Sequence, residues 1–164
     1  HRGVSVRIDH TDAEGRLILA DTMTYAQKQV KPDELMDVAT LTGAQVVALG
    51  QAASAIMGTD QKLVEQVIDA GKQGGEKLWQ LPLYDEYKEF LKSDVADMIN
   101  AGSRGQAGSS AAGTFLKEFV EEKQTWCHLD IAGPAYTTTD VPEIPKGATG
   151  VGVRTFVYYL YGLN

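Results

Sequence analysis

Residues 5–29 read SVRIDHTDAEGRLILADTMTYAQKQ, and their hydrophobic periodicity changes within a few positions. Residues 5–9 alternate apolar and polar side chains, which predicts a strand, whereas residues 17–29 space their apolar side chains as a helix does. Lys31 and Pro32 then predict the end of that helix. The stretch is therefore expected to form a strand followed by a helix.

A similar alternation of strand and helix patterns continues along the chain. Short apolar runs that end at glycine occupy residues 37–43 and 46–50, and a buried strand is expected at residues 126–133. Helices are expected at residues 60–71, 84–92, 109–122 and, although the pattern there also fits a strand, 149–164. Strands that alternate with helices predict an α/β fold with three α/β/α layers, in which helices cover both faces of a mostly parallel mixed sheet.

The composition is that of an ordinary soluble globular domain, since 43% of the 164 residues are hydrophobic and 23% are charged. The net charge of −7 argues against nucleic acid and anionic membrane surfaces as partners. No apolar stretch approaches the roughly 20 residues of a membrane span, and no secretory signal pattern opens the chain, so a cytoplasmic protein is expected. The single cysteine, Cys127, and the adjacent His128 are expected to pack inside a strand.

Two acidic residues, Asp12 and Glu14, lie between the predicted strand and the predicted helix. One interpretation is structural, because carboxylates at the start of a helix bind its free N–H groups and favour the positive end of its dipole. The other is functional, because closely spaced carboxylates after a strand collect divalent cations, and open α/β sheets bind ligands at that edge. The spacing alone does not decide between them.

Seven stretches, taken in order, resemble the landmarks of one known family. They are TDAEGRLILAD (11–21), DVATLTGAQVVALG (37–50), GEKLWQLPLYDEY (75–87), the AD at 96–97 followed by Asn100, SAAGTFLKEFV (110–120), WCHLDIAG (126–133) and KGATGVGVR (146–154). Together they cover nearly the whole chain and resemble the leucyl aminopeptidases, which are two-metal cytosol aminopeptidases. The resemblance implies that residues 1–164 form the C-terminal part of such a catalytic domain.

By this resemblance, Asp12 and Glu14 are ligands of two divalent metal ions, zinc or manganese. Paired ions can lower the pKa of a shared water and polarise the scissile carbonyl, so that no serine or cysteine nucleophile is required. Arg16 matches the arginine that holds a bicarbonate ion, which acts in the family as the general base. A guanidinium fork suits a planar oxyanion, whereas in an arbitrary sequence a surface salt bridge would be the expectation for Arg16.

The resemblance also implies a substrate pocket. Thr40, Leu41 and Gly43 match a segment whose backbone hydrogen-bonds the substrate, and a glycine permits close approach of the backbone. Ala132 and Ala135 match positions that line the pocket for the first side chain, although Ala135 equally fits plain packing between strand and helix. The implied reaction releases unblocked, leucine-like N-terminal residues from peptides, and the implied assembly of the full-length protein is a homohexamer.

Two departures from the family pattern favour a different function. His10 replaces the family's asparagine beside the predicted metal ligands. The family takes its remaining metal ligands and a substrate-polarising lysine from a segment before the signature, and these 164 residues, which enter a strand almost at once, do not contain it. We therefore expect part of a domain that binds metal weakly by itself. The alternative to an enzyme is a non-catalytic homologue that keeps only the fold and the oligomer contacts.

Overall fold

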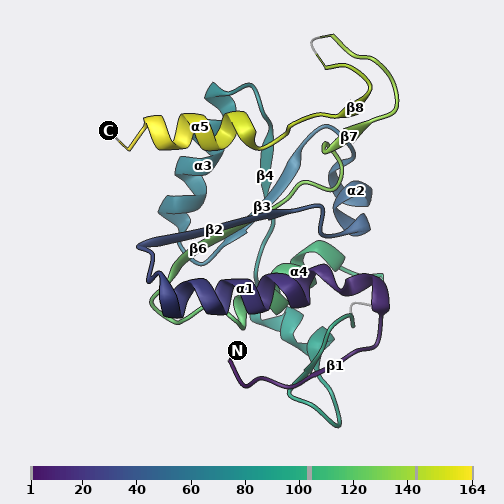
Figure 1. The fold of residues 1–164 in the computed structure, drawn as a ribbon. Coiled ribbons are helices and arrows are strands. Elements are labelled where there is room, and N and C mark those ends of the chain that lie inside the picture. The colour runs from purple at the N-terminus through teal and green to yellow at the C-terminus, as the bar shows by residue number, and fades with distance from the viewer. Residues whose placement is uncertain (1, 103–104, 143, 164) are drawn as a thin grey trace.

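The computed structural model describes residues 2–102, 105–142 and 144–163, and its centre is a four-stranded sheet (Figure 1). In spatial order the strands are β2 (Glu34–Ala39), β6 (Thr125–Asp130), β3 (Ser54–Gly58) and β4 (Leu78–Gln80). The pairs β2–β6 and β3–β4 are parallel, whereas β3 runs antiparallel to β6. The sheet is therefore mixed. The carboxyl ends of β2 and β6 lie along one edge of the sheet, and the carboxyl ends of β3 and β4 lie along the opposite edge.

Helices cover both faces of this sheet, so the expected three-layer α/β/α architecture is confirmed (Figure 1). One face carries α1 (Gly15–Gln29) and α4 (Gly108–Lys117), and the other carries α3 (Gln61–Gln73) and α5 (Val153–Tyr161). Helix α5 confirms the helix, and not a strand, that is expected within residues 149–164. In the part of the chain that the structure describes, no helix combines the length and the apolar character that a membrane crossing requires.

Strand β6 separates two hydrophobic cores, which explains why both of its faces are apolar. Trp126 is fully buried among the side chains of α1 and α4, whereas Cys127 and Leu129 pack against α3 and α5. Burial raises the pKa of the Cys127 thiol, so this residue packs as predicted and is not an activated nucleophile. His128 is also fully buried, and its Nδ1 lies 2.5 Å from Oδ1 of Asp37 on the neighbouring strand.

The predicted strand at residues 5–9 is shorter than expected and lies outside the main sheet. Strand β1 comprises only Val6–Arg7 and pairs in parallel with β5 (Met98–Ile99) in a separate two-stranded sheet. The pairing ends there because the backbone N–H of Asp9 donates to the side chain of Asn100 instead of to a neighbouring strand. Beyond β1 the chain is therefore held by the side chain of Asn100 and not by a neighbouring strand.

The apolar run at residues 46–50 forms the second half of helix α2 (Gly43–Leu49) and its C-cap residue Gly50, and strand β2 (Glu34–Ala39) ends before it. Thr42 caps this helix, because its Oγ1 accepts a hydrogen bond of 3.1 Å from the N–H of Gln45. The remaining elements are the 3₁₀ helices η1 (Thr11–Ala13) and η2 (Asp85–Leu91) and the hairpin of β7 (Tyr136–Thr137) and β8 (Gly147–Ala148). The helix predicted at 84–92 is thus a 3₁₀ helix.

Candidate functional site

The last residue of β6, Asp130, is a fully buried carboxylate at the edge of the sheet where β2 also ends. Its Oδ1 accepts hydrogen bonds from the N–H groups of Leu41 (3.0 Å) and Thr42 (3.3 Å). Its Oδ2 accepts from Oγ1 of Thr42 at 2.7 Å. These bonds fix the segment that follows β2 onto the end of β6.

The same carboxylate binds the segment that follows its own strand. Oδ1 of Asp130 accepts from the N–H of Ala132 at 3.3 Å, and Oδ2 accepts from Oγ of Ser109, at the start of α4, at 3.2 Å. The buried amide of Gln45 adds a second connection, because its Oε1 accepts from the N–H of Gly133 at 2.6 Å. The two predicted substrate-binding stretches, 40–43 and 132–135, are therefore neighbours in space.

The signature stretch reaches the same edge of the sheet through Gly15 and Arg16. A methyl group placed on Gly15 would lie 3.6 Å from Cδ1 of Leu41. Arg16 is buried, and its Nη1 donates a hydrogen bond of 2.6 Å to the backbone carbonyl of Asn100. Burial lowers the pKa of the Arg16 guanidinium, and the charge of Asp130 opposes that shift. Arg16 and Asp130 therefore lie within electrostatic range of each other.

Among the described residues, Nε of Arg16 is a buried donor without a hydrogen-bond acceptor. Buried donors are normally paired, so this N–H has the capacity to bind a further acceptor such as a small oxyanion.

The carboxylates of Asp12 and Glu14 do not cap the helix. Glu14 occupies the N-cap position of α1 but makes no side-chain capping hydrogen bond. The 3₁₀ turn η1 is capped by His10, whose Nδ1 accepts from the N–H of Asp12 at 3.2 Å. Both carboxylates are exposed, and neither forms a hydrogen bond or ion pair with any other residue that the structure describes. The capping hydrogen bonds of the structural interpretation are thus not observed, although Glu14 does lie at the positive end of the dipole of α1.

The chemistry of this pair fits part of a divalent metal site. Two exposed carboxylates without other partners are suitable ligands for zinc or manganese. Across residues 2–102, 105–142 and 144–163, however, no three His, Cys, Asp or Glu side chains form a group that could hold a metal ion. Asp12 and Glu14 therefore supply at most a partial set of ligands.

The predicted substrate residues differ in accessibility. Thr40 and Gly43 are exposed, and a methyl group placed on Gly43 would meet no atom within 4 Å. Gly43 is the first residue of α2. Ala132 and Ala135 are half-buried, and the N–H of Ala135 donates to the carbonyl of Ile131 at 3.0 Å.

Sequence reasoning missed the three buried polar residues that hold these segments together, Asn100, Gln45 and Asp130. Each lies at or just beyond an apolar strand or at a helix start, where a polar residue is inconspicuous. A polar side chain directly after an apolar run, as in WCHLD, is the signal that could have identified Asp130.

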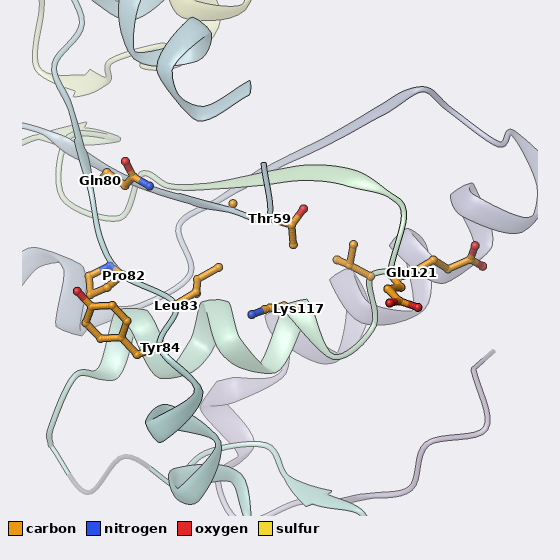
Figure 2. Close-up of a pocket in the computed structure, with 10 residues that line it drawn as sticks. Thr59, Gln80, Pro82, Leu83, Tyr84, Lys117 and Glu121 are labelled. Atoms are coloured by element: carbon orange, nitrogen blue, oxygen red, sulfur yellow. The ribbon is translucent and has the colours of Figure 1, made fainter. Parts of the chain in front are cut away.

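Two large cavities lie in the structure, one of them near the predicted site. One of about 930 Å³ lies beside the signature loop, and its lining includes Arg7, Asp9 and His10. Another of about 740 Å³ lies where β3 and β4 end, at the opposite edge of the sheet. Figure 2 shows Lys117 of α4 between Leu83 and Glu121 along this second cavity. None of the predicted site residues lines either cavity, but the first is lined by Asp9 and His10, which directly precede the signature stretch.

Residues 1–157 match the sequence model of the family described as "Cytosol aminopeptidase family, catalytic domain". The chain belongs to the cytosol aminopeptidase family. This is a family of metal-dependent aminopeptidases. Its "Probable cytosol aminopeptidase" from Geobacter sp. is 56% identical over 158 residues, which are 96% of this chain and 32% of that relative. The one from Chlorobaculum tepidum is 50% identical over 98% of this chain and 31% of its own length.

Solved structures place the chain in the same cytosol aminopeptidase fold. A mutant of the tomato leucine aminopeptidase superimposes with a TM-score of 0.90 at 44% identity, over 96% of this chain and 30% of its own. The bottromycin maturation enzyme BotP in complex with Mn gives 0.92 at 40% identity, over 98% of this chain and 36% of its own. The chain spans about a third of the length of the curated relatives that it matches.

Replacing Gly133 by alanine is expected to destabilise the full-length protein by at least about 2–3 kcal/mol, at the upper end of the usual range for overpacking. The added methyl group would lie 2.0 Å from the carbonyl oxygen of Gly50, which is backbone and cannot rotate away. Urea unfolding measures the change. The matched control is Gly43→Ala, which adds its methyl group to open space and should change the unfolding free energy by less than about 0.5 kcal/mol. Equal effects of the two substitutions would contradict the close packing at Gly133.

Proposed function

We propose that this chain is part of the catalytic domain of a two-metal aminopeptidase that releases unblocked, leucine-like N-terminal residues from peptides. One observation carries the proposal: the exposed carboxylates of Asp12 and Glu14, which have no partner among the described residues, directly precede Gly15, and Gly15 lies beside Leu41 at the edge where β2 and β6 end. This edge is where open α/β sheets bind their ligands. The metal-loaded neighbour supports the same assignment, because BotP was solved in complex with Mn.

In this proposal Asp12 and Glu14 hold the ions, and residues beyond the 164 described by this sequence complete the ligand set. The bound ions supply an activated water and polarise the scissile carbonyl. Arg16 supplies a buried positive charge, and its unpartnered Nε–H is free to donate to a bicarbonate ion. The charge of Asp130 partly compensates that of Arg16, and the hydrogen bond from Nη1 to the carbonyl of Asn100 holds the guanidinium in place.

The substrate-binding roles follow from which backbone groups are already used. The N–H of Leu41 is bound to Asp130, so Leu41 offers its carbonyl oxygen to the substrate. Gly43 offers its N–H, because the first N–H groups of a helix have no partner within the helix. Ala132 and Ala135 leave room for a leucine-sized side chain, since each contributes only one methyl group.

We also propose that the full-length protein is a cytoplasmic homohexamer to which this chain contributes a subunit contact. The exposed face of α5 supports this contact, because it presents Val153, Val157, Leu160 and Tyr161 to solvent. Exposed apolar patches of this kind mark interaction surfaces.

The alternative function, a homologue that keeps the fold and the oligomer contacts but does not hydrolyse peptides, is favoured by two observations. No described group of three ligands holds a metal, and His10 uses its ring nitrogen to cap η1 where the family pattern has asparagine. The measurement of leucine release that tests the aminopeptidase proposal also tests this alternative.

The full-length protein is expected to release leucine from a leucyl peptide and to lose this activity when a chelator removes its divalent ions. Added manganese or zinc should restore the activity, because the nucleophilic water depends on the ions. The rate of leucine release is measured by chromatography. The same peptide with an acetylated N-terminus is the control and should not be cleaved. A metal-loaded protein that binds two ions but releases no leucine would establish the non-catalytic alternative.

A further inference from the structure

Asn100, which directly follows β5, is a fully buried amide that binds the loop before α1. Its Oδ1 accepts hydrogen bonds from the N–H groups of Asp9 (2.8 Å) and His10 (3.2 Å). Its Nδ2 donates to the carbonyl oxygens of His10 (2.7 Å) and Ala13 (3.5 Å). An amide can accept two and donate two hydrogen bonds, so the side chain of Asn100 is fully used by this one loop.

The backbone of Asn100 forms two further hydrogen bonds, one to each side of this loop. Its N–H donates to the carbonyl of Arg7 at 3.0 Å, and its carbonyl accepts from Nη1 of Arg16 at 2.6 Å. Asn100 thus contacts the chain on both sides of Asp12, from the end of β1 to the first turn of α1.

The two candidate metal ligands have no comparable support of their own. Asp12 and Glu14 have exposed side chains, and within the described residues neither carboxylate is held by a hydrogen bond. The backbone of the loop therefore sets where each of these side chains begins, and so the region that each carboxylate can reach. The backbone of the loop is in turn fixed by Asn100 at residues 9, 10 and 13.

We propose that Asn100 is a positioning residue for the metal site: through four side-chain hydrogen bonds it fixes the loop of residues 9–14, so that Asp12 and Glu14 are arranged for metal binding before the metal arrives. This inference rests on the proposed function, since it concerns the same site. Residues that orient metal ligands without touching the metal typically change metal affinity by 10–100-fold when they are replaced.

The chemistry of the amide explains why asparagine is suited to this position. Aspartate has the same shape but no N–H, so it would leave the carbonyls of His10 and Ala13 without a donor and place a charge against them. Alanine would remove all four side-chain bonds. It would keep the backbone bond to Arg16, so the two effects can be separated.

Gln27 provides a matched control, because it is another buried amide that connects distant backbone segments. Its Nε2 donates to the carbonyls of Met23 and Phe119, both at 3.0 Å, and its Oε1 accepts from the N–H of Glu121 at 2.7 Å. These contacts join α1 to the end of α4, at the other end of α1 from the signature loop. Replacing Gln27 therefore removes a similar number of hydrogen bonds without touching the metal ligands.

The test uses the full-length protein and its variants Asn100→Ala, Asn100→Asp and Gln27→Ala. Calorimetric titration with Mn²⁺ measures metal affinity, and hydrogen exchange measures the protection of the amides of residues 9–13. Both Asn100 variants are expected to bind Mn²⁺ about 10–100-fold more weakly and to exchange these amides faster. Gln27→Ala is expected to lower the melting temperature but to keep the Mn²⁺ affinity within about threefold, well below the effect of an orienting residue.

Several outcomes would overturn the inference. Unchanged Mn²⁺ affinity in both Asn100 variants would show that the carboxylates do not depend on this amide, while the proposed function would stand. An equal loss of affinity in Gln27→Ala would reduce the effect of Asn100 to general destabilisation. A wild-type protein that binds no Mn²⁺ would overturn the proposed function and this inference together. If Asn100→Ala does not fold, the isosteric Asn100→Asp decides the question with both measurements.

Discussion

Replacing Asp12 by asparagine, or Glu14 by glutamine, is expected to lower leucine release by the full-length protein by about 10³-fold or more, while its melting temperature stays almost unchanged. The loss follows because a bound ion stabilises the transition state by several kcal/mol, and each 1.36 kcal/mol corresponds to a factor of ten in rate. The fold should tolerate the change because both side chains are exposed and neither caps a helix. Surface substitutions of this kind usually change stability by no more than about 0.5 kcal/mol.

Initial rates of leucine release and calorimetric melting curves check this prediction together. Glu86→Gln is the matched control, because Glu86 is also an exposed carboxylate in the first turn of a helix, η2, on another part of the surface. It should leave both measurements unchanged. A large drop in melting temperature for Asp12→Asn would instead assign that carboxylate a structural role. Retained activity in both variants would show that neither Asp12 nor Glu14 is a metal ligand.

Replacing Asp130 by alanine is expected to have the largest effect on stability, several kcal/mol in the full-length protein. The carboxylate is fully buried and accepts hydrogen bonds from Leu41, Thr42, Ser109 and Ala132. Each buried donor left without an acceptor destabilises the fold by about 1–3 kcal/mol. The substitution would also leave the buried Arg16 without its compensating negative charge. Since a whole domain is stable by only about 5–15 kcal/mol, partial unfolding is the expected result.

Urea unfolding followed by circular dichroism measures the change. The control is Asp60→Ala, which removes a carboxylate that caps α3 through one hydrogen bond, from the N–H of Leu63 at 2.8 Å. Loss of such a cap costs about 1 kcal/mol. If Asp130→Ala were no more destabilising than Asp60→Ala, the carboxylate of Asp130 would not be the main connection between the two substrate-binding stretches.

Local patterns in the sequence were sufficient for most of the secondary structure and for the layer order. The apolar spacing of residues 17–29 produces α1, and the largely apolar run at 126–129, which includes His128, produces a strand buried on both faces. These patterns report which sides of an element are apolar, and burial of those sides between two layers of helices leaves few arrangements. The signature motif was also sufficient to single out Asp12 and Glu14 as candidates, because a motif is a property of neighbouring residues.

The tertiary structure alone decided which polar groups bind one another at the candidate site. The hydrogen bonds of Asn100 with Asp9, of Arg16 with Asn100 and of Leu41 with Asp130 join residues that are 91, 84 and 89 positions apart. Periodicity carries no information about such pairs, because a buried polar side chain can be satisfied by any backbone group that the fold brings close. For the same reason the sequence did not show that the strand expected at residues 5–9 is limited to Val6–Arg7. The sequence by itself determined the elements and the candidate ligands, whereas their convergence at Asp130 and Asn100 depends on how the chain folds back on itself.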